Sequence, residues 1–425
     1  MINRRQFLLS SSAAFAAQSK PNVLLINTDD QRWDTIRALG NPEIHTPNLD
    51  SLVRRGMVFR NFYCQGSMVG AVCLPSRTML MTGRTLWRIP GRQQPPPPGL
   101  PLLPKAFEAA GYATFHVGKK GNTYLPASQA FQQCLFSEDL TPDRALQSAK
   151  HADAFLQFLE KRPANQPFFA YIAPPVPHDP RVAEERFMKM YDPEKITLSP
   201  NFMPAHPFDN GELKVRDEML APFPRTPADM RRHLAEYYAC VTGLDHHIGR
   251  IVDAINAKGL AANTFVVFTS DQGLAVGGRH GLMGKQNLYE HFKAPLIFAG
   301  PGIKPGAAAA LAYVHDIFPT LAALAGIPAA AGVEGVSLAP IITGKAKAVR
   351  AHLFAAYRDV QRMVRDDRYK LLWYPRIKLY QFFDLREDPH ERNDLAAHQA
   401  RIAALKKAMR AQQQSLKDDP ALYPL

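Results

Sequence analysis

The chain has 425 residues, of which 46% are hydrophobic and 21% are charged. This composition is typical of a globular protein long enough to bury a large core, and it excludes a disordered chain. The 51 Lys and Arg residues against 38 Asp and Glu give a formal charge of +13, which favours anionic partners. The basic residues are scattered and show no zinc-finger spacing, so we expect no nucleic-acid partner.

The N-terminus has the order of an export signal. Arg4 and Arg5 precede a weakly apolar stretch and the small-residue site Ala14-Phe15-Ala16. This order predicts a twin-arginine signal peptide over residues 1–16, with the fold starting near residue 20. The alternative is an N-terminal arm with a chance arginine pair. No later stretch has the ~18 uninterrupted apolar residues needed to cross a bilayer. We therefore expect a periplasmic or extracellular protein without stable membrane insertion.

Four short apolar runs, each followed by polar residues, predict the fold class. They cover 22–27, 112–117, 168–173 and 264–269, and helical segments such as 236–257 separate them. Near-continuous apolar runs are typical of a buried, mostly parallel central sheet flanked by helices in an α/β fold. Ligands of such sheets bind beyond the carboxyl ends of the strands. We therefore expect convergence of the polar residues at those ends, which are Asp29, Asp30, Lys119, His178, Asp271 and Gln272.

Part of this set predicts a metal site. Three carboxylates and one amide oxygen come from Asp29, Asp30, Asp271 and Gln272, and the chain has no thiolate pair or histidine pair at metal spacing. Such oxygen ligands suit Ca²⁺ or Mg²⁺ rather than zinc. The alternative interpretation is that the two adjacent aspartates only cap a helix after a strand.

The cysteines are few, and one of them stands in an unusual context. Cys64, Cys73, Cys134 and Cys240 form no disulfide framework and no CxxC pair. Cys73 opens the stretch CLPSR at 73–77, at the start of what looks like an amphipathic helix. Read as a structural residue, Cys73 would be a small buried hydrophobe.

The stretch around Cys73 carries a family resemblance. The residues Cys73-x-Pro75-Ser76-Arg77, followed by Thr82-Gly83-Arg84, resemble the signature of the type I sulfatases of the alkaline-phosphatase-like superfamily, whose cysteine is oxidised after translation to formylglycine. Other blocks similar to the family follow in the expected order, and together they span almost the whole chain: PNVLLINTDD at 21–30, HTPNLDSLVRRG at 45–56, GYATFHVGK at 111–119, PHDP at 177–180, SDQGLAVGGRHGLMGKQNLYEH at 270–291, and the stretch 365–396.

The resemblance implies a sulfatase acting on a sulfated small molecule or polysaccharide, and a formylglycine-generating enzyme as a partner during maturation. The hydrate of formylglycine made from Cys73 would attack sulfur with one hydroxyl, and the second would later collapse to the aldehyde and expel sulfate. Ca²⁺ would be held by residue 73 together with Asp29, Asp30, Asp271 and Gln272.

The resemblance also implies roles for the cationic residues. Arg77 and Lys119 would stabilise the hydrate, while His178 and Lys285 would bind the sulfate and the leaving oxygen, with His178 as the acid that protonates it. The sequence departs from the family at position 121, where Gly118-Lys119-Lys120-Gly121 lacks the usual histidine. We expect Asn122 or His280 to take over its hydrogen bond. Gln272 stands where asparagine is more common.

Two segments lie outside these motifs. The insertion 182–230, rich in Pro, Met and charge, either shapes the substrate pocket or is exposed filler. Alternating aromatic residues at 369–374 and a helical stretch at 396–416 predict a smaller C-terminal subdomain of antiparallel sheet plus helix. We place it at 346–425, after a catalytic domain at 20–345.

Two other function classes compete with a sulfatase. A phosphoryl-ester hydrolase of the same superfamily would share the metal carboxylates, but it normally has threonine or serine where Cys73 stands. An inactive carbohydrate-binding homologue would be compatible with the missing histidine.

Overall fold

The structure, a computed structural model, describes residues 20–91, 94–395 and 397–425. The signal peptide predicted at 1–16 lies outside the described residues. Within the described part of the chain, no helix combines the length and the apolar character needed to span a bilayer.

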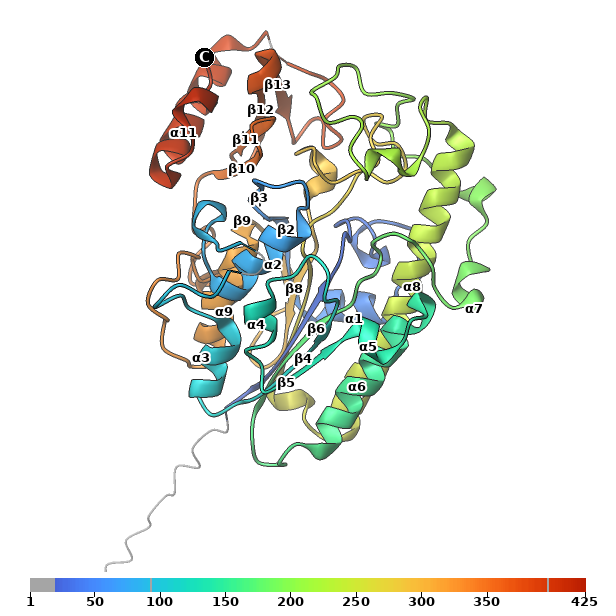
Figure 1. Ribbon diagram of the computed structural model, residues 1–425, viewed down its shortest axis with the longest axis vertical. Coiled ribbons are helices and arrows are strands. Elements are labelled where there is room, and N and C mark those ends of the chain that lie inside the picture. Colours follow the sequence, from blue (N-terminus) through green and yellow to red (C-terminus); the bar gives the residue numbers. More distant parts are fainter. Residues whose placement is uncertain (1–19, 92–93, 396) are drawn as a thin grey trace, which may run out of the picture.

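An eight-stranded sheet forms the centre of the described molecule (Figure 1). Its strand order is β5-β4-β6-β1-β7-β8-β2-β9. Strand β8 is antiparallel to its neighbours β7 and β2, and the other pairings are parallel. The mostly parallel sheet predicted from the apolar runs is confirmed. The strands are Asn22–Thr28 (β1), Met57–Tyr63 (β2), Ala113–Gly118 (β4), Gln133–Phe136 (β5), Phe168–Ala173 (β6), Thr264–Ser270 (β7), Leu296–Ala299 (β8) and Gly306–Tyr313 (β9).

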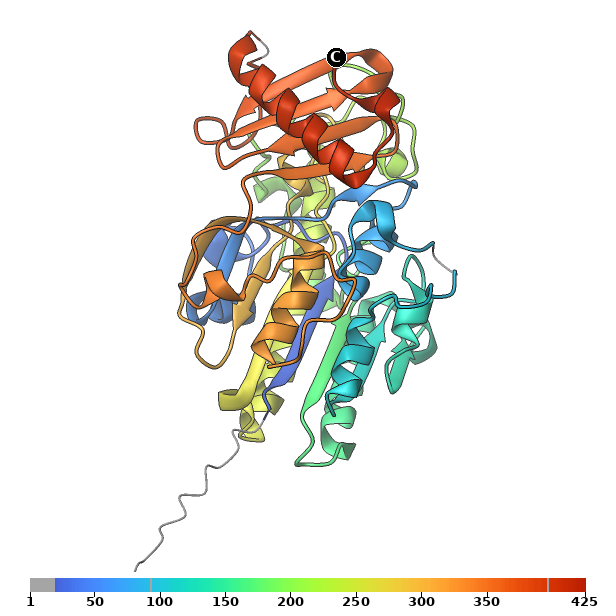
Figure 2. The same ribbon diagram turned by 90° about the vertical axis from the view of Figure 1, so that its left-hand side faces the viewer.

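Both faces of this sheet are buried, because helices cover each of them (Figures 1 and 2). Successive side chains of a strand point to opposite faces. Val23 and Leu25 therefore join one core with α2, α3 and α9, and Leu24 and Ile26 join another with α1, α6 and α8. The covering helices are Pro47–Arg55 (α1), Cys73–Thr82 (α2), Leu103–Ala109 (α3), Gln147–Lys161 (α6), Pro227–Ala257 (α8) and Ile317–Leu324 (α9). Shorter helices are Leu125–Ser128 (α4), Ser137–Leu140 (α5), Glu185–Met188 (α7) and Ala339–Ile342 (α10).

A second, five-stranded sheet packs above the first with the order β13-β12-β11-β10-β3 (Figure 2). Its C-terminal strands form the predicted antiparallel sheet, and β3, from much earlier in the chain, adds a parallel edge. One face packs on α11, and the other face packs into the core shared with α2. The elements are Gly66–Ser67 (β3), Leu353–Tyr357 (β10), Gln361–Arg365 (β11), Tyr369–Tyr374 (β12), Leu379–Asp384 (β13) and Gln399–Leu416 (α11).

Two helices differ from their prediction. Helix α8 begins at Pro227 rather than at residue 236, because Thr226 caps it by accepting a hydrogen bond from Asp229 N and proline occupies its first turn. Helix α2 is not amphipathic. Except for the half-buried Leu74, its side chains are buried, because the two sheets and α9 enclose it.

Candidate active site

The predicted site residues converge at the carboxyl edge of four adjacent strands. Asp29 and Asp30 follow β1, Asp271 follows β7, Lys119 follows β4, and His178 lies in the turn after β6. Because these strands are neighbours in the order β4-β6-β1-β7, their ends meet at one place. Helix α2 begins there with Cys73.

Cys73 lies at the centre of this cluster and is fully buried. Its sulfur is 3.2 Å from Asp29 Oδ1 and 3.7 Å from Asp30 Oδ1. Gln272 Nε2 donates to it at 3.1 Å, and Lys285 Nζ lies 3.2 Å away. Burial and the Asp29 carboxylate raise the pKa of the Cys73 thiol well above its ordinary value. The unmodified side chain is thus a neutral thiol in a polar, enclosed site.

The donor atoms of the cluster fit a hard cation. Potential ligand atoms of Asp29, Asp30, Cys73 and His178 all lie within 4.8 Å of one another. Gln272 Oε1 is buried and has no hydrogen-bond partner among the described residues, which leaves an oxygen acceptor free for a cation. Crowded carboxylates and an unpartnered amide oxygen are the ligands that Ca²⁺ prefers.

Asp271 lies beside these ligand atoms with its carboxylate already engaged. Its Oδ1 accepts hydrogen bonds from the backbone N–H groups of Asp30 and Gln272, both at 3.0 Å. Its Oδ2 pairs with Arg77 Nε at 3.0 Å. Burial and the nearby Asp29 carboxylate raise the pKa of Asp271 to about 7. Asp271 thus orients the backbone at Asp30 and Gln272 and ties it to Arg77.

Three buried cations face the carboxylates. Arg77 pairs with Asp271, Lys119 pairs with Asp29, and Lys285 contacts Asp30 Oδ1 and Oδ2 at 3.0 and 2.8 Å. Burial alone would favour a neutral Asp29, but the Lys119 ammonium and the other cations hold the pKa of this carboxyl well below its ordinary value. The cluster thus combines an anionic donor set with positive charge suited to a sulfate group.

His178 presents one ring nitrogen to the cluster. Its Nδ1 lies 2.7 Å from the carbonyl oxygen of Asp179. Because a carbonyl oxygen only accepts, Nδ1 carries the hydrogen of that bond. Nε2 lies 3.7 Å from Asp30 Oδ2, on the side of the proposed metal ligands. Nε2 is therefore the ring nitrogen available for proton transfer near the cluster.

Two cavities lead to the cluster, with volumes of about 460 and 400 Å³. Asp29, Lys119 and Gly121 line the first, Lys285 lines the second, and Asn122 and His178 line both. Cys73 itself lines neither cavity, but Asp29 and Lys285, which both contact its sulfur, line one each. A substrate lying in the cavities would therefore have its reacting group beside these residues.

The structure does not bring His280 to Cys73. His280 stacks on Tyr289 with ring centroids 4.1 Å apart, and its Nε2 lies 3.0 Å from Asn201 Nδ2. These contacts hold its ring in a separate buried cluster. Of the two residues expected to replace the family histidine, Asn122 lines both cavities and His280 lines neither.

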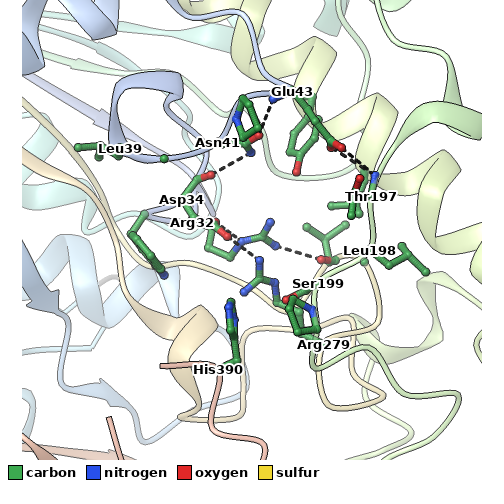
Figure 3. Close-up of a pocket in the computed structure, with 18 residues that line it drawn as sticks. Arg32, Asp34, Leu39, Asn41, Glu43, Thr197, Leu198, Ser199, Arg279 and His390 are labelled. Atoms are coloured by element: carbon green, nitrogen blue, oxygen red, sulfur yellow. Dashed lines mark hydrogen bonds and ion pairs between the residues drawn. The ribbon is translucent and has the colours of Figure 1, made fainter. Parts of the chain in front are cut away.

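A further cavity of about 430 Å³ lies apart from these residues (Figure 3). Arg32 and Arg279 converge on Asp34 at its centre, and Glu43 and His390 lie at its margin (Figure 3). None of the site residues predicted from the sequence lines this cavity. This cavity is therefore formed around a neighbouring ion-pair network and is separate from the Cys73 cluster.

Sequence reasoning did not single out Asp179, Arg216, Asp217 and Glu218, which contact the residues and loops of the site. Arg216 and Asp217 pair with each other, and both line the second cavity. Three of these four lie in the insertion 182–230, so the interpretation of that insertion as filler is wrong for this part. The only sequence signal for these residues was a group of charged residues in a segment without helical or strand periodicity.

The family assignment rests on comparison with known proteins. A family model described as Sulfatase matches residues 21–327. The chain belongs to the sulfatase family. A model described as N-sulphoglucosamine sulphohydrolase, C-terminal, matches residues 278–419 of this sulfatase.

Curated relatives support the same assignment. Arylsulfatase A of Homo sapiens is 30% identical over 467 residues, which cover 93% of this sulfatase and 83% of the relative. N-acetylglucosamine-6-O-sulfatase of Bacteroides thetaiotaomicron is 25% identical and covers 88% and 82% of the two chains. The protein is a sulfuric ester hydrolase, as predicted.

Solved structures confirm the alkaline-phosphatase-like fold. One, in complex with its substrate D-glucosamine-2-N,6-O-disulfate, has a TM-score of 0.77 at 21% identity and covers 95% of this sulfatase and 99% of that chain. Phosphonate monoester hydrolase of Agrobacterium radiobacter has a TM-score of 0.76 at 22% identity, covering 93% and 95%. At these identities the likeness concerns the fold alone.

Proposed function

We propose that this sulfatase hydrolyses a sulfate monoester of a carbohydrate, using formylglycine made from Cys73 and a bound Ca²⁺. The observation that carries the proposal is the surroundings of Cys73, whose sulfur lies 3.2 Å from both an aspartate oxygen and a lysine ammonium. An ordinary core cysteine packs among apolar groups instead.

Cys73 would be converted by a formylglycine-generating enzyme that reads the CLPSR stretch. When hydrated, the modified residue would supply two hydroxyls on one carbon, one to attack sulfur and one whose collapse to the aldehyde releases sulfate. Lys285, which contacts the Cys73 sulfur, would place positive charge beside the reacting group. Arg77 pairs with Asp271 and places a second cation in the same cluster.

The metal would be held by Asp29, Asp30, Gln272 and the modified residue 73, with Asp271 beside them. Bound there, Ca²⁺ would supply charge that polarises the attacking hydroxyl and a sulfuryl oxygen. The free Oε1 of Gln272 and the close approach of the ligand atoms of Asp29, Asp30 and Cys73 support this part of the proposal.

His178 and Lys119 would complete the reaction from the cavity side. His178 would act in its doubly protonated form: it keeps its Nδ1 hydrogen on the Asp179 carbonyl, gives its Nε2 proton to the departing sugar oxygen, and is left as the neutral ring. Lys119, paired with Asp29, would hold the sulfuryl oxygens in place as negative charge develops. Asn122, between the two cavities, would supply the hydrogen bond of the missing family histidine.

The carbohydrate assignment is supported by the relatives and by charge. One relative is named as an N-acetylglucosamine-6-O-sulfatase, and one similar fold holds a sulfated glucosamine. The formal charge of +13 favours an anionic substrate. Both cavities present several charged and amide side chains that can hydrogen-bond to sugar hydroxyls and to sulfate.

A substrate panel tests the proposal. Purified protein with Ca²⁺ is assayed on nitrophenyl sulfate, nitrophenyl phosphate, a phenylphosphonate ester, and N- and O-sulfated glucosamine. We expect the sulfate esters to have the highest kcat/KM. Faster turnover of the phosphate or phosphonate would support the phosphoryl-ester hydrolase instead, and sugar binding without any turnover would support an inactive homologue.

We further propose export by the twin-arginine route, on the strength of Arg4 and Arg5 and the apolar stretch after them. Expression of the full chain followed by cell fractionation tests this. The protein should leave the cytoplasm, and a chain with both arginines changed to lysine should remain there. Equal export of the two chains would contradict the proposal.

A further inference from the structure

Arg216, Asp217 and Glu218 are three consecutive charged residues of the insertion. They contact the turn after His178, Gln286 beside Lys285, and the loop before Lys285, respectively. They lie far from the catalytic residues in sequence and adjacent to them in space. The side chain of Asp217 is not used to cap the short helical turn that begins at Glu218. Its carboxylate is therefore available for contacts with other elements.

Arg216 holds the turn that carries His178. Its guanidinium pairs with both carboxylate oxygens of Asp179, with a distance of 2.8 Å to Oδ1. The carbonyl of Asp179 in turn accepts the His178 Nδ1 hydrogen bond. Arg216 also pairs with Asp217 at 2.9 Å. This pair connects the His178 turn to the part of the site around Lys285.

Asp217 provides a second carboxylate near the Lys285 ammonium, in addition to Asp30. Its Oδ2 lies 3.9 Å from Lys285 Nζ and accepts a hydrogen bond from Gln286 Nε2 at 2.9 Å. The Oε1 of the same Gln286 accepts from the backbone N–H of Lys285 at 3.0 Å. Asp217 therefore acts on Lys285 in two ways: its carboxylate lies near the ammonium, and Gln286 links it to the Lys285 backbone.

Glu218 fixes the loop from which Lys285 projects. Its two carboxylate oxygens accept the backbone N–H groups of Met283 and Gly284 at 2.8 and 2.9 Å, and Arg225 balances its charge at 2.9 Å. A Cβ at Gly284 would lie within 2.8 Å of a Glu218 oxygen. This close approach leaves the loop little freedom to shift.

We propose that Asp217 is a positioning residue that holds the Lys285 ammonium in place for the sulfuryl group. Lysine has a flexible four-carbon stem, and the other contacts of its ammonium are with Asp30 and the Cys73 sulfur. In the proposed function these two residues also engage the metal and the substrate, so a carboxylate outside that set is needed to hold the ammonium. Asp217 is such a carboxylate, and it lies in a segment tied to both the His178 turn and the Lys285 loop, which restricts where the ammonium can lie. The inference rests on the proposed function, since it assigns Lys285 to the substrate sulfate.

A double-mutant cycle on the Ca²⁺-loaded full chain tests the proposal. The variants are Asp217→Asn, Lys285→Ala and the double substitution. Asparagine keeps the shape of the side chain and an oxygen for Gln286 but removes the charge. Glu194→Gln, an exposed residue of the same insertion, is the matched control. The measurements are the dissociation constant of inorganic sulfate, kcat/KM on nitrophenyl sulfate, and the melting temperature.

We expect Asp217→Asn to raise the sulfate dissociation constant and to lower kcat/KM, each by about tenfold, as is usual for directly coupled charges. In the Lys285→Ala background the same change should alter neither by more than about twofold. An equal loss in both backgrounds would show a merely structural role, and no loss in either would also overturn the proposal. If sulfate binds but no sulfate ester is hydrolysed, the proposed function fails while the binding cycle still decides the role of Asp217.

Discussion

The ammonium nitrogen of Lys285 lies 3.2 Å from the sulfur of Cys73, although 212 residues separate them in the chain. The same nitrogen contacts both carboxylate oxygens of Asp30. Lys285 thus joins the proposed nucleophile position to a proposed metal ligand. Positive charge at this point is preorganised for the oxygens of a sulfuryl group.

The position of His178 predicts a dependence on the leaving group. If Nε2 protonates the departing oxygen, His178→Ala should lower kcat/KM on an alkyl sulfate by roughly 10²–10⁴-fold. Nitrophenyl sulfate needs no proton on its leaving group, so it should lose less than about tenfold. Steady-state kinetics on both substrates measure the difference.

The exposed His246 on α8 provides the control for this experiment, since His246→Ala should leave both rates unchanged. Equal losses of His178→Ala on the two substrates would exclude the acid role and leave His178 as a sulfate ligand or a packing residue.

The free amide oxygen of Gln272 predicts a ligand role. Ca²⁺ at 100 times its Kd should stabilise the chelator-treated protein by about 2.7 kcal/mol. Gln272→Leu removes the oxygen and should weaken Ca²⁺ binding by about tenfold or more, equivalent to about 1.4 kcal/mol. Calorimetric titration measures the affinity, with the exposed Gln129→Leu as the control. Unchanged Ca²⁺ affinity of Gln272→Leu would remove this residue from the metal site.

Asn122 and His280 make opposite predictions about the missing family histidine. Both have positive φ, 47° and 53°, so glycine removes each side chain without straining the backbone. Asn122→Gly should lower kcat by about tenfold, the scale of a lost hydrogen bond to a charged group, with little change in stability. His280→Gly should lose about 2–3 kcal/mol of stability with its stacking on Tyr289, while kcat remains within a few-fold. The reverse pattern would assign the role to His280.

Asp245 on α8 predicts a pH dependence of stability that is independent of the active site. Burial raises the pKa of this carboxyl from 3.8 to about 6. Between these values the folded chain keeps a proton that the unfolded chain has lost, so stability should fall as pH rises from about 4 to 6, by about 2–3 kcal/mol. Chemical denaturation at each pH measures this fall. Asp245→Asn should flatten it, and an unchanged slope would contradict the assignment.

Much of the site was predictable because chemistry-bearing residues follow buried strands. The run before Asp29 reads as a strand with both faces covered, and the rule for the carboxyl ends of parallel strands then brings Asp271 and Lys119 to the same edge. The CLPSR stretch added Cys73, which no strand rule could place. The sequence also contains a signal for the start of α8, because Thr226 and Pro227 are typical of a helix N-terminus.

Other features depend on contacts that no local pattern encodes. The edge strand β3 pairs with β10 from nearly 300 positions later, and β8 runs against its neighbours, through long-range hydrogen bonds alone. His280 stands in a family-like block, yet stacking on Tyr289 draws it away from Cys73. Asp217 lies 69 positions from its partner Gln286, in a segment without periodicity.

The central claim is that the active enzyme carries formylglycine at residue 73, and peptide mass analysis combined with turnover tests it most directly. Preparations made with and without a formylglycine-generating enzyme are compared for the converted fraction and for kcat per molecule. We predict that kcat rises in proportion to the converted fraction, and that Cys73→Ala keeps the fold but loses turnover. Full activity in a preparation that contains only unmodified Cys73 would contradict the account.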